Sequence, residues 1–157
     1  MDIEKTYERH FGAVYRLCLM HTKNVADAED AAQDVFYKLM RRDREFDSAE
    51  HEIAWLIRVA STTSLDLLRR KYRTDTELPE HMPAHKGTDH SGLSDVAGAV
   101  LALPDKLKTA VYLHYYEGYS SAEIAQITGF PHSTIRGRLS DARLRLKEIL
   151  GEDFLNE

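Results

Sequence analysis

Three carboxylates repeat along the segment DAEDAAQDVFYKLM, residues 27–40, at a spacing that places them on one side of a helix. Asp27, Asp30 and Asp34 stand at i, i+3 and i+7, with Gln33 beside them. Such an acidic stripe can ligate Mg²⁺ in a nuclease, form the negative half of a docking site, or be solvated surface. A separate apolar stripe, expected to face the core, consists of Ala28, Ala32, Val35 and Leu39. The segment alone leaves all three interpretations open.

Positive charge gathers in the segment 120–150. Residues 121–128 have an apolar face, Gly129 and Pro131 redirect the chain, and a second helix is expected over residues 132–150. The inward positions of this second helix are Ile135, Leu139, Ala142, Leu146 and Ile149. Its range holds five basic and two acidic residues, a net charge of +3. The pattern predicts a helix-turn-helix that binds DNA, the alternative being a helical hairpin with solvated arginines.

The start of the second helix is expected to face base edges, and its later cations are expected to face phosphates. The candidate base-reading residues are His132, Ser133, Thr134 and Arg136, of which Ser133 or Thr134 could also cap the helix. The candidate phosphate contacts are Arg138, Arg143 and Lys147. Asp141 lies among them and would repel phosphate if it faced DNA.

A second basic cluster ends a helix that is expected over residues 52–71. It comprises Arg69, Arg70, Lys71 and Arg73. Cations at this place offset the negative C-terminal end of a helix, but four cations among the five residues 69–73 are more than this effect requires. Because Trp55, Arg58 and Tyr72 are nearby in sequence, the cluster predicts a second nucleic-acid surface with aromatic rings available for stacking. Trp55 taken alone is better explained as a core residue.

Composition limits the class of protein. The net charge of −5 over 157 residues argues against a protein that coats nucleic acid without regard to sequence. Cys18 is the only cysteine, which excludes an internal disulfide, and its phase with Tyr7, Phe11 and Val14 predicts a buried thiol. No secretory signal and no apolar run of the roughly 18 residues of a membrane span are found, so a soluble, cytoplasmic protein is expected.

The chain is expected to be all-α, with two small helical domains joined by a flexible linker. Residues 74–100 hold five acidic residues and one basic residue, and the prolines and glycines among them are typical of a linker. The predicted domains are residues 1–73 and 93–157, with the linker at residues 74–92. Helices are expected over residues 3–21, 25–41, 52–71, 93–102, 105–117, 121–128 and 132–150.

Nothing in the sequence favours an enzyme. The carboxylates of residues 27–34 are not accompanied by a metal-binding histidine pair on a predicted helix. His81, His85 and His90 fall in the predicted linker at irregular spacing, which is typical of solvated residues. There is no phosphate-binding glycine loop and no nucleophile elbow. We therefore expect no metal, no cofactor, no small-molecule substrate and no catalytic residue.

Three motifs in order resemble the bacterial extracytoplasmic function (ECF) sigma factors of RNA polymerase, group IV of the sigma-70 family. They are DAEDAAQDVFYKLM, AWLIRVASTTSLDLLRRKYR, and the segment from Leu103 to Leu150 that contains the helix-turn-helix. The resemblance covers nearly the whole chain outside the linker. It implies a transcription initiation factor whose partners are the core RNA polymerase, through its β′ clamp helices and β subunit, promoter DNA, and an anti-sigma factor that is often membrane-anchored.

The resemblance also implies roles for residues. The segment 27–40 would dock on the polymerase, with contacts from Asp27, Asp30, Gln33, Asp34, Phe36 and Lys38. The N-terminal domain would open and read the −10 element near residues 43–52 and along the third helix, with contacts from Arg58, Thr62, Arg69, Arg70, Lys71 and Arg73. The helix that starts at His132 would read the −35 element. An acidic stripe suits a protein partner, because it would repel DNA.

Two departures from the family pattern bear on DNA contacts. Ser61-Thr62 stands where Arg-Asn is common, and Ser140-Asp141 stands where a basic or histidine-containing pair is common. Three other classes remain as alternatives: a stand-alone helix-turn-helix regulator, a metal-dependent nuclease, and an interaction module such as an anti-sigma factor. Each explains only part of the pattern.

Overall fold

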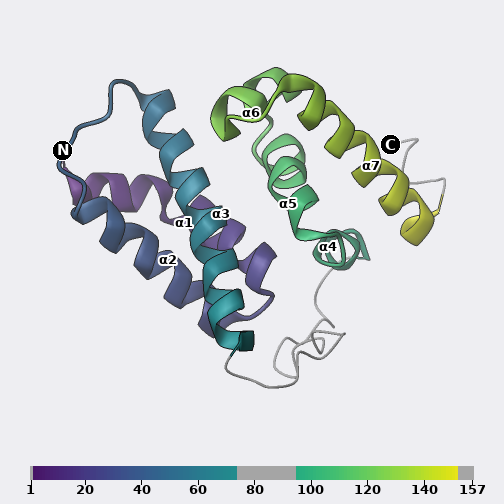
Figure 1. Cartoon of the computed structure of the whole chain (residues 1–157), viewed down its shortest axis with the longest axis horizontal. Helices are drawn as coiled ribbons and strands as arrows, with labels where there is room; N and C mark the ends of the chain where they lie inside the picture. The colour runs from purple at the N-terminus through teal and green to yellow at the C-terminus, as the bar shows by residue number, and fades with distance from the viewer. Residues whose placement is uncertain (1, 74–94, 152–157) are drawn as a thin grey trace. The chain divides into compact units, whose positions relative to one another are not determined.

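The computed structural model describes residues 2–73 and 95–151, except for the side chains of Tyr72, Arg73 and Asp95. Within these two ranges every regular element is helical, which confirms the all-α prediction (Figure 1). The chain divides into two compact units, and the division falls among residues 74–94. The predicted linker and its three histidines therefore lie outside the described residues. None of the described helices is long and apolar enough to cross a membrane.

The N-terminal unit consists of three helices that all contact one another: α1 (Ile3–Thr22), α2 (Val25–Met40) and α3 (Ala49–Arg73). Asp2 and Asn24 cap the first two helices by accepting hydrogen bonds from the backbone N–H groups of Lys5 and Asp27. Lys23, with φ of 59°, makes the left-handed turn between them. The ranges predicted for these two helices are confirmed within one residue.

Helix α3 begins three residues earlier than predicted. Ser48 precedes it and accepts a hydrogen bond from the backbone N–H of His51 at 3.0 Å, while its carbonyl accepts from the N–H of Glu52 at 3.1 Å. This is the N-cap arrangement, in which a serine side chain satisfies an amide that has no partner within the helix. The apolar pattern predicts the buried part of α3 but gives no sign of this polar first turn.

The core of the N-terminal unit follows the predicted stripes closely. Ala28, Ala32, Val35 and Leu39 of α2 are each 0% exposed, as expected. Leu56, Ile57, Ala60 and Leu68 of α3 are also buried. Cys18 is also buried as predicted, and burial raises the pKa of its thiol to about 11. The thiol is therefore a packing group, not a nucleophile, at neutral pH.

The C-terminal unit contains α4 (Asp95–Leu101), α5 (Asp105–Val111), α6 (Ser121–Thr128) and α7 (His132–Leu150). Helix α5 continues as a π-helical segment, η2 (Tyr112–Tyr116), so the single helix expected over residues 105–117 changes its hydrogen-bond pattern halfway. Helix α7 contacts α4, α5 and α6. Four of its five predicted inward residues are buried, whereas Ile149, near the end of the helix, is 54% exposed and was predicted wrongly.

The turn between α6 and α7 has the predicted geometry. Ser120 and Glu123 form a capping box at the start of α6, and the backbone hydrogen bond from Ser120 lowers the pKa of the Glu123 carboxyl. Gly129, with φ of 82°, ends α6 in the left-handed conformation that glycine adopts without strain. The cap predicted for α7 is wrong: its N-cap is Pro131, and Ser133 and Thr134 lie within the first helical turn.

Candidate functional site

The outward face of α2 is partly as predicted. Asp30 and Gln33 are exposed, and the Asp34 side chain is 38% exposed. Two large side chains that the sequence analysis missed continue this face: Tyr37 is 55% exposed and Met40 is 61% exposed. We call Asp30, Gln33, Asp34, Tyr37 and Met40 the α2 face. Beside it, an apolar groove runs toward α1 and is lined by residues that include Ile3, Tyr7 and Phe36.

Two predicted docking residues do not belong to this face. Asp27 is 7% exposed, and its Oδ2 accepts a hydrogen bond from Lys71 Nζ at 2.8 Å. Its negative charge is therefore paired with a lysine of the same unit. Phe36 is 4% exposed and packs against the rings of Tyr7 and Phe11, at centroid distances of 4.8 and 6.0 Å. Spacing on a helix indicates a shared side but not where the neighbouring helices cover it, and a polymerase contact from Asp27 or Phe36 stays a prediction.

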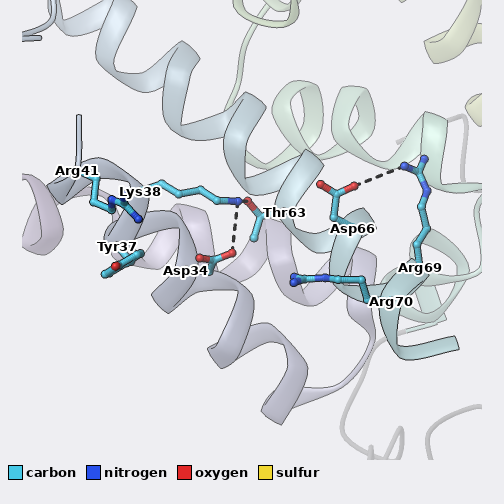
Figure 2. A pocket seen from close by; sticks show the side chains of 8 residues that line it. All are labelled: Asp34, Tyr37, Lys38, Arg41, Thr63, Asp66, Arg69 and Arg70. Atoms are coloured by element: carbon cyan, nitrogen blue, oxygen red, sulfur yellow. Dashed lines mark hydrogen bonds and ion pairs between the residues drawn. The ribbon is translucent and has the colours of Figure 1, made fainter. Parts of the chain in front are cut away.

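Lys38 connects α2 to α3. Its Nζ donates to Thr63 Oγ1 at 2.9 Å and lies 3.3 Å from Asp34 Oδ2 (Figure 2). The ammonium group thus holds the Asp34 carboxylate near the α3 side of the α2 face. A pocket between α2 and α3 is lined by these side chains and also by Arg41, Asp66, Arg69 and Arg70. Lys38 therefore orients Asp34, whether or not Lys38 itself contacts a partner protein.

The residues predicted to meet the −10 element differ in their surroundings. Arg58, Thr62 and Arg70 are exposed along α3, and the Thr62 hydroxyl donates to the Arg58 carbonyl at 2.8 Å. Arg69 is also exposed and pairs loosely with Asp66 at 3.5 Å. Lys71, by contrast, donates a hydrogen bond to the buried Asp27 carboxylate. The side chain of Arg73 lies outside the described residues, so that prediction stays a prediction.

Replacing Lys71 by alanine should lower the stability of the N-terminal unit more than it changes DNA binding. The change leaves the largely buried Asp27 carboxylate without its closest cation. We expect a loss of about 1 kcal/mol, limited because the Lys71 side chain is 45% exposed and water screens the pair. Urea unfolding of the full chain measures it. Arg69→Ala is the control, since it removes only an exposed pair, and equal losses from both changes would contradict the structural role of Lys71.

A cluster of rings lies at the connection between α2 and α3. The Arg42 guanidinium carbon is 4.3 Å from the centre of the Phe46 ring and 5.5 Å from that of Trp55. Phe46 also lies 5.8 Å from Trp55 and 5.2 Å from His51, between ring centroids. All four side chains are half-buried. The sequence favours a core position for Trp55 and gives no role to Phe46, although Phe46 is an aromatic residue inside an otherwise polar connection.

Two side chains in the first two turns of α7 contact neighbours from the preceding turn and from α6. His132 is exposed, and its Nε2 is hydrogen-bonded to Ser121 Oγ at 2.7 Å. Arg138 is half-buried, with its guanidinium carbon 4.2 Å from the centre of the Phe130 ring. Ser133 is exposed and Thr134 is half-buried. Two predicted DNA contacts are therefore oriented by residues that the sequence analysis did not single out.

The cations farther along α7 form an exposed basic side. Arg136 and Arg143 are exposed, and Lys147 is half-buried. Asp141, expected to repel phosphate, accepts a hydrogen bond from Arg145 Nε at 3.0 Å. This pair offsets the negative charge locally, so Asp141 does not cancel the basic side.

Among the described residues, no group of three or more histidine, cysteine, aspartate or glutamate side chains could hold a metal ion. Asp27 pairs with Lys71 and Asp34 pairs with Lys38, so these two carboxylates have separate cationic partners. The surfaces that could bind a partner are the acidic and aromatic α2 face, the aromatic cluster around Phe46 with Arg42, and the basic side of α7.

Comparisons with known proteins identify both units. Residues 6–74 match the family model Sigma-70 region 2, and residues 94–146 match Sigma-70, region 4. The ECF RNA polymerase sigma factor SigM of Mycobacterium tuberculosis is 30% identical over 155 residues, covering 98% of this chain and 78% of its own. SigE of Mycolicibacterium smegmatis is 30% identical over 159 residues, and the chain spans 62% of its length.

A solved structure has the same fold. It is the sigma factor RpoE in complex with the anti-sigma factor NepR from Bartonella quintana. The TM-score is 0.73 at 26% sequence identity, with 97% of this chain and 98% of the other covered. The likeness extends over both helical units.

Proposed function

Because this chain belongs to the ECF sigma factors of RNA polymerase, we propose that it binds core polymerase and directs it to promoters through the surfaces described above. The observation that carries the proposal is that one unit has an acidic, aromatic face on α2 and the other unit has a basic side on α7. The first suits a protein partner and the second suits DNA. A single-purpose DNA-binding protein has no need of the α2 face.

The α2 face is the proposed polymerase-binding surface. Its two carboxylates, Asp30 and Asp34, can pair with basic side chains of the β′ clamp helices, and they repel DNA. Tyr37 and Met40 add large, exposed contact area of the kind that is enriched at interface centres. The β subunit is a further proposed contact of the polymerase.

Helix α7 is the proposed reader of the −35 element. Residues at its N-terminal end lie where a recognition helix meets base edges in the major groove, and Arg143 and Lys147 follow where phosphates pass. The orientation of His132 by Ser121 and of Arg138 by Phe130 supports this assignment. Side chains that are held before binding lose less conformational freedom on binding.

The aromatic cluster at Phe46 and Trp55 is the proposed site where the −10 element is opened. Extruding a base costs a few kcal/mol, which stacking on a ring and nearby cations can offset. Arg42 lies over both rings, and Arg58, Arg69 and Arg70 extend the cationic surface along α3. This supports strand opening without nucleotide hydrolysis, by a protein that is not an enzyme.

The remaining proposals concern partners and location. The solved relative is bound to an anti-sigma factor, and we propose that an anti-sigma factor also controls this chain. Because its main partner is RNA polymerase, the proposed location is the cytoplasm. Neither a small-molecule substrate nor a cofactor is part of the proposal.

Run-off transcription with purified core polymerase tests the proposed function. Core enzyme, with and without the chain, transcribes a pool of bacterial promoter fragments. We expect defined transcripts from a small subset of the pool only when the chain is present. If the chain bound duplex DNA tightly without polymerase and left the transcripts unchanged, it would be a stand-alone helix-turn-helix regulator.

Replacing Phe46 by alanine should impair promoter opening while leaving polymerase binding intact. Loss of one stacking platform costs about 1–3 kcal/mol per base, so we expect open complexes to fall by roughly 10-fold or more. Permanganate reactivity of unpaired thymines around the −10 element measures opening. A promoter with a pre-opened mismatch bubble should restore transcription by the Phe46→Ala chain, and a failure of the bubble to rescue it would contradict the assignment.

A further inference from the structure

Glu52 places a negative charge against α1 with incomplete pairing. It lies in the first turn of α3, and its side chain is 14% exposed. Its Oε2 lies 3.9 Å from Arg9 Nη1, and its Oε1 lies 3.5 Å from His10 Nε2. This Oε1 atom is buried and accepts no hydrogen bond from the residues that the structure describes. The carboxylate therefore joins α3 to α1 without having all its charge compensated.

The stability of the fold does not explain a carboxylate at this place. Burying a charge costs free energy unless close cations and hydrogen bonds replace the water that is lost. The Arg9 side chain is 58% exposed, so water screens its attraction to Glu52. Burial, which Glu52 opposes and Arg9 reinforces, lowers the pKa of His10, so this ring is mostly neutral at pH 7. An uncharged side chain at position 52 would avoid the cost.

The contact of Glu52 with α1 serves position rather than stability. Apolar contacts, such as those of the buried Ala54 and Leu56, stabilise α3 but define its position less strictly. A charged group between two polar partners favours one arrangement over its neighbours. Glu52, facing Arg9 and His10, thus defines where the first turn of α3 lies on α1.

The first two turns of α3 carry the rings on which Phe46 packs. His51 precedes Glu52, and Trp55 follows Glu52 by three residues, which is nearly one helical turn. The ring of Phe46 lies 5.2 Å from that of His51 and 5.8 Å from that of Trp55, between centroids. The backbone N–H of Asp47 also donates to His51 Nδ1 at 3.2 Å. A displacement of this part of α3 would therefore displace the aromatic cluster.

We propose that Glu52 is a positioning residue, which holds the first turn of α3 against α1 so that Phe46 and Trp55 stay in place to receive an extruded base. The proposal rests on the proposed function of the aromatic cluster. Glu52 does not contact the DNA itself, since its charge would repel the phosphates. It acts through the rings that follow and precede it.

The test compares Glu52→Gln with Glu8→Gln in the full chain. Glutamine keeps the size of the side chain and removes its charge. Glu8 is the matched control, because it is an exposed carboxylate of α1 in the same unit. Thermal unfolding should give both variants a Tm within about 3 °C of the wild type, since neither change leaves a buried charge without a partner.

The fluorescence of Trp55 reports the position of the cluster directly, because it is the only tryptophan of the chain. Its emission should shift to longer wavelength in Glu52→Gln, as the ring becomes more accessible to water. It should stay at the wild-type wavelength in Glu8→Gln. This readout needs neither polymerase nor DNA.

Permanganate reactivity of a duplex promoter with core polymerase measures opening. Open complexes should fall about fivefold with Glu52→Gln, as expected when residues of one network are uncoupled. Polymerase affinity, and transcription from a promoter with a pre-opened mismatch bubble, should remain at the wild-type level. In a Phe46→Ala chain, Glu52→Gln should lower opening no further, because the ring that it positions is absent.

Several results would overturn the proposal. They are wild-type opening by Glu52→Gln, unchanged Trp55 emission, an equal loss with Glu8→Gln, or losses from Glu52→Gln and Phe46→Ala that are independent of each other. So would a Tm of Glu52→Gln lowered beyond the stated range, because Glu52 would then serve the fold.

Phe46→Ala alone distinguishes a failure of this inference from a failure of the proposed function. If Phe46→Ala impairs opening and Glu52→Gln does not, the aromatic cluster opens the −10 element but Glu52 does not position it. If Phe46→Ala opens the promoter normally, the cluster is not the site of opening, and both proposals fail.

Discussion

A chain in which Asp30 and Asp34 are both replaced by alanine should bind core polymerase about 10–100-fold more weakly than the wild type. The two carboxylates are the negative charges of the α2 face, and each is within reach of a protein partner. Removing Asp34 does not remove the link between α2 and α3, since Lys38 still donates to Thr63. The loss should therefore appear in binding and not in folding.

Titration of labelled chain with core polymerase measures the affinity, and circular dichroism checks the helices. A double change of Glu8 and Glu50 to alanine is the control, since it removes the same charge from exposed positions of α1 and α3, outside the α2 face. The difference between the two double variants should shrink as salt is raised, because screening weakens the charge pairs. Equal affinities at low salt would show that the α2 face does not bind polymerase.

The second large effect is expected from Arg136 and Arg143. Changing both to alanine should lower promoter-specific transcription by about 100-fold while polymerase binding remains. A lost base contact costs about 1–3 kcal/mol, and a lost phosphate contact weakens binding on every sequence. Arg136→Ala alone should relax the sequence preference at one position, whereas Arg143→Ala alone should reduce the salt dependence of promoter binding.

Lys106→Ala is the matched control for these arginines. Lys106 is an exposed cation of α5 in the same unit, outside the basic side of α7. It should have little effect on transcription. If Lys106→Ala reduced transcription as much as Arg136→Ala, net charge rather than a specific contact would be responsible.

The features of the fold that the sequence predicts correctly depend mostly on residues that are close together in the chain. The apolar stripes of α2 and α7 and the turn at Gly129 depend on neighbours within a few residues, and these features are confirmed. The first turn of α3 was missed because its cap is a single serine in a polar segment. The π-helical segment at Tyr112 was missed because a change of hydrogen-bond register leaves the apolar pattern nearly unchanged.

The candidate site depends more on contacts between distant residues. Asp27 and Lys71 are 44 positions apart and form one ion pair, which neither of their two segments indicates by itself. Phe36 lies four residues after the buried Ala32, which is core spacing, and it packs against Tyr7 of α1. Tyr37 could have been predicted from its place one turn beyond Gln33 and Asp34. Its exposure becomes clear only when all three helices are packed.

Gel filtration with bacterial core RNA polymerase tests most directly the claim that this chain is a polymerase-binding promoter specificity factor. The full wild-type chain is mixed with core enzyme in moderate salt, and the fractions are analysed for both. We predict that the chain elutes with the polymerase at one chain per core enzyme. Separate elution of a folded chain at micromolar concentration would contradict the claim, and the α2 face would then be ordinary solvated surface.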